Sequence, residues 1–177
     1  MNLREQILAE HSKSNALKVA DWVGEDTGRF KKLMDLFLND EYRVVQRAAH
    51  IISLIAKRHP AMITPYLGSL VAKMQEPGQP VAVKRNAVRI LQFREIPEAL
   101  HGPVMNACFD FLANVKETVA VRAFSMTVLA GLGKTYPEIR EELRAVIEDG
   151  LEQEPMPGFR SRGLKTLKSL DAELKRP

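Results

Sequence analysis

The sequence repeats itself with a period of 38 residues, and this repeat restricts the possible folds more than any other feature. Four stretches begin at Val45, Val83, Val121 and Phe159. In each stretch a large apolar residue is followed four positions later by a small residue, and three positions after that by a β-branched one. The later members of these columns are Ala49, Ile52, Ala87, Ile90, Ser125, Val128, Gly163 and Thr166. Positions i, i+4 and i+7 lie on one face of an α helix, so each stretch predicts a helix that a neighbouring helix can approach closely.

The segments between these stretches carry a weaker second repeat. Pro65 and Pro103 are also 38 residues apart, and each suits the first turn of a helix, where proline costs no hydrogen bond. Proline-containing breakers separate the expected helices, and nothing reads as a strand. The unit is therefore helix, turn, helix. A single domain over 1–177 is expected, with helical hairpins at 28–59, 60–96, 97–136 and 137–177.

Residues 1–27 do not fit this register. Residues Leu3 to Glu10 and Asn15 to Val23 read as two helices, and Ser14 or Asn15 is available as the N-cap of the second. The end repeats of helical solenoids are normally atypical. We therefore expect residues 1–27 to form an N-terminal cap.

The stretch 33–40, followed by Val44 to Ala49, resembles a HEAT repeat, in which an Asp after the first helix precedes a Val-Arg-x-x-Ala pattern. Val121-Arg122 matches the Val-Arg pair and Val83-Lys84 approaches it, whereas the other two copies have Val45-Gln46 and Phe159-Arg160. The Asp is present only as Asp40, and the matching positions are Gly78, Lys116 and Glu154. The resemblance covers about residues 28–173 and extends to short bacterial HEAT-like proteins. It implies an all-α, right-handed α-α superhelix, but no particular activity.

Basic residues are concentrated in the second helix of each expected hairpin, which the resemblance places on the concave wall of a solenoid. The stretches 41–58, 80–95, 116–134 and 157–176 contain seventeen basic and five acidic residues, a balance of +12. Because the whole chain carries +4, the remainder carries −8. The expected surface contains Arg43, Arg47, Lys84, Arg85, Arg89, Arg122, Arg160 and Arg162.

Two kinds of partner suit such a surface. The leading hypothesis is a non-enzymatic scaffold that binds an acidic protein or peptide by shape and electrostatic steering. The alternative is nucleic-acid binding, which requires a cationic surface for the phosphates. A structural role also has to be weighed, because the resemblance implies that the Arg after the Val pairs with a ladder of Asp residues. That ladder is mostly missing here, so Lys84, Arg122 and Arg160 are expected to have few partners.

The sequence offers little for catalysis. The histidines His11, His50, His59 and His101 are scattered, and no zinc motif, phosphate-binding loop, dinucleotide fingerprint or nucleophile elbow occurs. We expect His50 to lie on the exposed side of its helix and His59 to end that helix. Cys108 reads as a buried apolar residue. We therefore expect no catalytic residue, metal site, cofactor or small-molecule substrate.

Two families of helical enzymes have features that can be sought in this sequence. Bacterial alkylpurine DNA glycosylases are built from HEAT-like repeats with a basic groove, and use tryptophans and an acid at the damaged base. The only candidates here are Asp21 and Trp22, and a core position is the expected role of Trp22. Adenylosuccinate lyases and fumarases have a Ser-rich signature loop, but residues 154–159 lack its Ser, Lys and Asn, so this chemistry is rejected.

Composition and hydropathy limit the location. No apolar run approaches the roughly 20 residues that a membrane span needs. The N-terminal residues Met1 to Gln6 lack the apolar core of a signal peptide. We therefore expect a cytoplasmic protein that does not bind membranes.

Overall fold

The structure is a computed structural model that describes residues 1–153 and 156–175. These residues form helices joined by turns, without a strand among them. The predicted all-α, HEAT-like fold class is confirmed. The chain divides into two compact units, Met1–Ile90 and Leu91–Pro177, which are described separately below.

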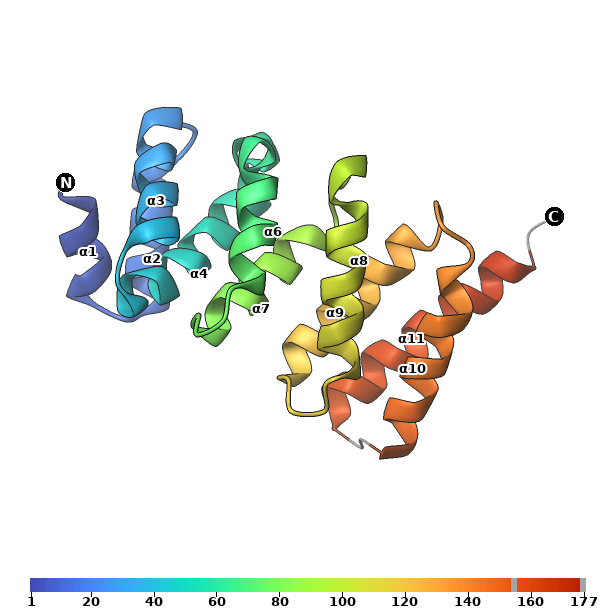
Figure 1. The fold of residues 1–177 in the computed structure, drawn as a ribbon. Coiled ribbons are helices and arrows are strands. Elements are labelled where there is room, and N and C mark those ends of the chain that lie inside the picture. Colours follow the sequence, from blue (N-terminus) through green and yellow to red (C-terminus); the bar gives the residue numbers. More distant parts are fainter. Residues whose placement is uncertain (154–155, 176–177) are drawn as a thin grey trace. The chain divides into compact units, whose positions relative to one another are not determined.

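The first unit consists mostly of short helices, with the longer α4 among them, joined by turns (Figure 1). The helices are α1 (Leu3–Ala9), α2 (Lys13–Val23), α3 (Thr27–Asn39), α4 (Tyr42–Arg58), α5 (Pro60–Ile63), the 3-10 turn η1 (Thr64–Tyr66), α6 (Leu67–Gln75) and α7 (Val81–Leu91), whose last residue lies beyond the unit boundary. Helix α4 packs against α1, α2 and α3. The residues predicted to form a cap therefore form α1 and α2, and the predicted hairpin 28–59 corresponds to α3 and α4.

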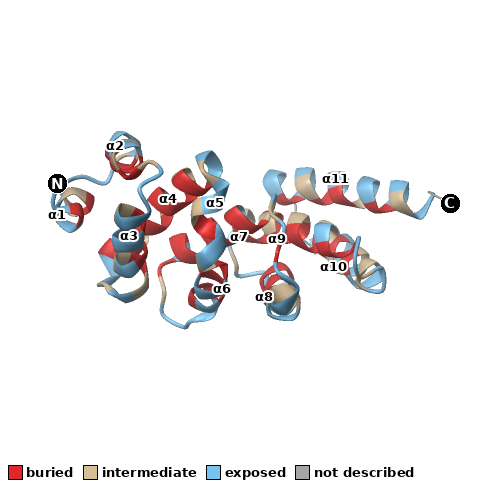
Figure 2. Cartoon of the chain, turned by 90° about the horizontal axis from the view of Figure 1, so that it is seen from above, coloured by how far each residue is buried: buried red, intermediate tan, exposed pale blue. Residues whose placement is uncertain are grey.

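The second unit contains two longer helical pairs. Helices α8 (Glu98–Ala113) and α9 (Val119–Leu132) form the first, and α10 (Ile139–Gln153) and α11 (Pro157–Leu174) form the second. Helix α9 packs against both α8 and α11, and α10 packs against α11. Figure 2 shows the consequence for α11, which has buried residues along one side and exposed residues along the other.

The repeated columns of the sequence form the packed faces of α4, α7, α9 and α11. All twelve column residues, from Val45 to Thr166, are buried. The small column allows close approach, as predicted: a Cβ atom on Gly163 of α11 would lie 3.2 Å from Cγ2 of Ile147 on α10. The repeat in the sequence therefore encodes helix packing.

Two local predictions are wrong. Helix α8 begins at Glu98, so Pro103 lies inside this helix rather than in its first turn. The N-cap of α2 is Ser12, not Ser14 or Asn15, because Ser12 Oγ accepts a hydrogen bond from the Asn15 amide at 3.0 Å. The buried Asn15 instead joins α1 to α2, since its Nδ2 donates to the carbonyl oxygens of Gln6 and Glu10 at 2.8 and 3.0 Å.

Candidate interaction surface

The eight basic residues predicted to form one binding surface lie in three different environments. Arg43, Arg85, Arg89 and Arg160 are exposed, Arg47, Lys84 and Arg162 are partly buried, and Arg122 is buried. The prediction is therefore wrong for Arg122, and the partly buried residues need separate consideration.

Arg122 lies in the core of the second unit, with only 3% of its surface exposed. Its Nε donates to the Leu112 carbonyl oxygen at 2.9 Å, at the C-terminal end of α8. The guanidinium stacks on the Phe159 ring, 4.3 Å from its centroid. The expectation that Arg122 has few partners is wrong. Its neighbour is an open pocket of about 280 Å³ lined by Ala113, Val115, Arg122, Ala145, Val146, Asp149, Gly150 and Gln153.

Arg47 makes an equivalent contact in the first unit. Its Nη1 donates to the carbonyl oxygens of Ile7 and Leu8, both at 2.9 Å, at the C-terminal end of α1. The last carbonyl groups of a helix have no partner within the helix, and they lie at the negative end of its dipole. A neighbouring cation therefore stabilises the helix end.

The same contact, in which a basic side chain donates to a carbonyl oxygen near the end of a helix, recurs elsewhere along the chain. Lys73 Nζ donates to the Leu38 carbonyl oxygen near the end of α3, at 2.8 Å. Arg29 Nη1 donates to the Trp22 carbonyl oxygen near the end of α2, at 2.7 Å, and Arg140 Nε to the Gly133 carbonyl oxygen after α9, at 2.8 Å. Part of the basic excess is thus used within the fold. The sequence analysis did not predict this use. The position of Arg122, directly after the buried Val121 and beside the packed face of its helix, was a signal for it.

Arg162 also contributes to packing. Its Nη1 donates to Gln92 Oε1 at 2.8 Å and to Thr127 Oγ1 at 2.6 Å, all within the second unit. Its guanidinium lies 5.9 Å from the centroid of the Phe124 ring. Arg162 therefore joins α11 to α9 and to the segment after α7, and contributes less to the exposed surface than predicted.

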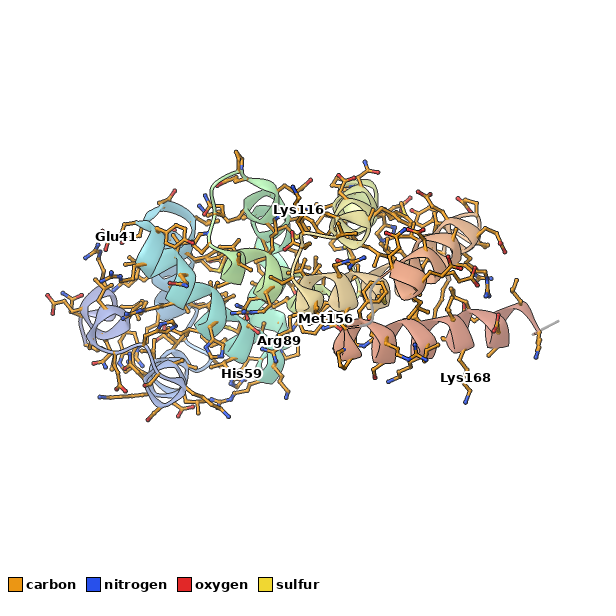
Figure 3. All side chains as sticks on the ribbon, turned by 90° about the horizontal axis from the view of Figure 1, so that it is seen from below. Glu41, His59, Arg89, Lys116, Met156 and Lys168 are labelled. Carbon is orange, nitrogen blue, oxygen red and sulfur yellow. The ribbon has the colours of Figure 1, made fainter. Side chains whose placement is uncertain are left out.

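The exposed face of α11 is both basic and apolar. Its residues Arg160, Leu164, Lys165 and Lys168 are exposed, with Leu164 at 49%, and Figure 3 shows Lys168 pointing away from the helix. None of the three cations forms an ion pair with the residues that the structure describes. We refer to these four residues as the α11 face.

The acids near the C-terminal end of α11 are paired with α10. Arg144 binds Asp171, and Arg140 Nη2 lies 3.4 Å from Glu173 Oε2. The pKa of Arg144 is raised by its hydrogen bond to Asp171. These carboxylates therefore do little to neutralise the cations of the α11 face.

The first unit has a smaller exposed group on α7. Val81, Arg85 and Arg89 follow one another at intervals of four residues and are exposed, so they share one side of the helix. Both arginines act on His50 of α4, which is partly buried rather than exposed as predicted. Burial lowers the pKa of His50, and the charges of Arg89 and Arg85 lower it further.

Asp40 occupies the position of the Asp in the HEAT-repeat pattern. Its partner is not an Arg of a second helix but a residue of α1. Arg4 of α1 binds it with both arms, through Nε to Oδ2 at 2.9 Å and Nη2 to Oδ1 at 3.1 Å. This hydrogen bonding holds the pKa of Asp40 below its usual range. The cap residues are thus tied to the first hairpin through the Asp40 carboxylate.

The residues weighed for chemistry have contacts within the chain. Asp21 pairs with Arg58, and Trp22 is partly buried beneath the Arg29 guanidinium, 4.4 Å from the ring centroid, rather than in the core. His59 ends α4, as predicted. Cys108 is buried, and this burial raises the pKa of its thiol to about 12. Over residues 1–153 and 156–175, no group of three His, Cys, Asp or Glu side chains could hold a metal ion.

No helix within the described part of the chain has both the length and the apolar character required to cross a bilayer.

The packed helical pairs define the chain as an α-helical repeat protein. It belongs to the HEAT repeat domain family, whose sequence model matches residues 3–170. The match begins within α1 and so includes the N-terminal residues outside the 38-residue register. HEAT repeats are generally non-enzymatic scaffolds that mediate protein interactions. Searches of curated proteins and of solved structures give no match.

Proposed function

We propose that this chain is a non-enzymatic binding module that holds an acidic protein or peptide through the α11 face. The single observation that carries this proposal is an exposed leucine among cations that form no ion pair with residues 1–153 or 156–175. Arg160, Leu164 and Lys168 are spaced four residues apart, so they follow one line along the helix. Lys165 lies directly beside Leu164.

This combination suits a protein better than a nucleic acid. Cations steer an acidic partner and fix its orientation, whereas an apolar side chain supplies affinity when it is buried in the interface. Phosphate groups would use the cations alone. The Val81, Arg85 and Arg89 group on α7 also combines an exposed apolar side chain with exposed basic ones, and it is a second candidate contact for an acidic segment.

The first test compares two double variants of equal net charge. Lys165→Gln/Lys168→Gln alters the α11 face, and Lys18→Gln/Lys32→Gln removes two exposed lysines of α2 and α3. The probe is a labelled random copolymer of Glu and Leu, with polyglutamate and DNA of matched charge alongside, followed by fluorescence anisotropy over a salt series. We expect the α11 variant to bind the copolymer about tenfold more weakly, and the control to change little, because direct charge contacts contribute most. Equal binding by the two variants would overturn the proposal.

A third variant, Leu164→Ala, separates the two classes of partner. It should weaken copolymer binding about threefold to tenfold through lost apolar burial and leave polyglutamate and DNA binding unchanged. If DNA binds more tightly than the copolymer, with the log of its association constant falling linearly against log salt, nucleic-acid binding replaces the proposal.

The natural partner can then be sought by capture from native lysate, with and without nuclease. Capture that resists nuclease, is reduced by the Lys165→Gln/Lys168→Gln variant and is unaffected by the Lys18→Gln/Lys32→Gln control supports a protein partner. Capture that nuclease abolishes assigns a nucleic acid instead.

A further inference from the structure

A small pocket with both polar and apolar lining lies within the first unit, where the end of α1, the start of α2 and the middle of α4 meet. Its volume is about 190 Å³. It is lined by Ile7, Glu10, His11, Ser12, Lys13, Asn15, Ala16, Arg47, His50 and Ile51. The α11 face contains none of these lining residues, so the role of the pocket can be tested separately from that of the α11 face.

The lining has a strong excess of basic side chains. His11, Lys13, Arg47 and His50 contribute to it, and Glu10 is the only acidic residue of the lining. From α7, the charges of Arg85 and Arg89 also act on His50, as do His11 and Lys13. The positive end of the α2 dipole adds to the same potential.

Arg47 has further hydrogen-bond donors besides Nη1, and it lines this pocket. Within the described part of the chain, only its Nη1 forms hydrogen bonds, which it donates to the carbonyl oxygens of Ile7 and Leu8. Its Nε is buried without a hydrogen-bond partner among the described residues. A buried donor without an acceptor is costly and uncommon in native structures, so an acceptor from outside the chain would stabilise this arrangement.

We infer that this pocket binds a small oxyanion of the phosphate type, held by Arg47, Lys13 and the two histidines. Its volume suits a group of a few heavy atoms and not a large metabolite. Protonation of His50 adds a positive charge inside the pocket, so the affinity for a dianion rises as the pH falls from 8 to 6. The ligand is either free phosphate or a phosphate ester carried by a peptide.

Sulfate is the first probe, because it remains a dianion over this pH range. Any pH dependence of its affinity therefore comes from the protein. Sodium sulfate is titrated into the whole chain at several pH values, with chloride at equal ionic strength as reference. The imidazole Cε1–H resonances of His11 and His50 are followed by NMR. We expect both to shift with one saturating constant that tightens with acid, whereas those of His59 and His101 should not.

Matched variants separate pocket binding from general charge effects. Lys13→Gln and Lys18→Gln each remove one exposed lysine from α2, but only Lys13 lines the pocket. Lys13→Gln should weaken sulfate binding by up to about thirtyfold, the effect of one unit charge about 4 Å from a dianion in water. Lys18→Gln should have little effect. His50→Gln should bind sulfate with a weaker dependence on pH than the wild type.

The source of the anion is decided by two further ligands, inorganic phosphate and a short neutral peptide that contains one phosphoserine. Tighter binding of the phosphopeptide indicates a partner-borne phosphate, and tighter binding of inorganic phosphate indicates a free anion. Linear, non-saturating shifts, or equal effects of Lys13→Gln and Lys18→Gln, would overturn the inference. Failure of the α11 variants to alter copolymer binding would leave it unaffected.

Discussion

Arg47 and Arg122 perform the same structural task in surroundings that differ greatly. Each donates to carbonyl oxygens at the C-terminal end of an earlier helix, α1 for Arg47 and α8 for Arg122. Arg122 is enclosed by the Phe159 ring and is almost fully buried. Arg47 is only partly buried, has an Nε without a hydrogen-bond partner among the described residues, and borders the small pocket of the first unit.

This difference in burial determines what each arginine can do besides capping the C-terminal end of a helix. Enclosure makes the Arg122 contact strong, because a buried carbonyl that loses its donor cannot turn to water. It also leaves Arg122 with only 3% of its surface exposed. The partly open Arg47 contributes less to stability, but its remaining donors and the neighbouring histidines stay within reach of a small ligand.

Loss of the ring that encloses Arg122 should have the largest effect. Phe159 is completely buried, and Phe159→Ala should lower the free energy of unfolding by about 3–5 kcal/mol, as cavity formation in a core does. Urea denaturation followed by circular dichroism measures this. The control, Phe93→Ala, removes a ring that is 84% exposed and should change stability by less than about 0.5 kcal/mol. Similar losses for both variants would show that Phe159 does not enclose a core.

The comparison itself is tested by replacing each arginine with methionine, which keeps much of the side-chain length but has no donor. Arg122→Met should cost about 2–3 kcal/mol, since it leaves the buried Leu112 carbonyl without a charged donor. Arg47→Met should cost only about 1 kcal/mol, because the last turn of α1 can be reached by water. The same denaturation measurement applies. A larger loss for Arg47→Met would reverse the contrast between the two units.

The close packing around Arg122 can be tested with a single methyl group. A Cβ on Gly150 would lie 2.4 Å from Cζ of Phe159 and 3.4 Å from Nη2 of Arg122. Gly150→Ala should therefore destabilise by about 1 kcal/mol, the net of an overpacking cost and a gain in helix propensity. Gly131→Ala on α9 meets no atom within 4 Å and should stabilise by up to about 1 kcal/mol. Stabilisation by both would indicate that the Phe159 ring moves freely.

The helices could be predicted from the sequence because the residue pattern that specifies each helix is local and repeated. The spacing of Val121, Ser125 and Val128 specifies one face of a single helix, and all three residues are buried. Pro103 is an exception, because its spacing from Pro65 indicated a helix start, yet α8 already begins at Glu98.

The use of the cations could not be predicted in the same way. The acceptors of Arg47 lie about 40 positions away, at Ile7 and Leu8, and a charge count does not indicate which helix end a guanidinium will reach. His11 and His50 are also distant in the sequence, so the pocket they share had no pattern. By contrast, Arg43, Arg85, Arg89 and Arg160 are exposed, as expected for members of a binding surface.

The smallest expected effect is the dependence of stability on pH that His50 introduces in the first unit. Burial, Arg89 and Arg85 depress its folded pKa below the ordinary 6.5. The folded protein then resists a proton that the unfolded chain accepts, so the contribution of His50 is full above pH 6.5 and is lost as the pH falls through the folded pKa.

The comparison of wild type with His50→Gln isolates this contribution, because all other titrations are shared and cancel. The free energies of unfolding of the two proteins should converge between pH 8 and pH 5. Sulfate should reduce the wild-type loss at low pH if a dianion in the pocket favours protonated His50. Parallel pH profiles would mean that His50 is hydrated and that its surroundings do not oppose its charge. The pocket beside Arg47 would then be open to water, and the contrast with the enclosed Arg122 would be greater still.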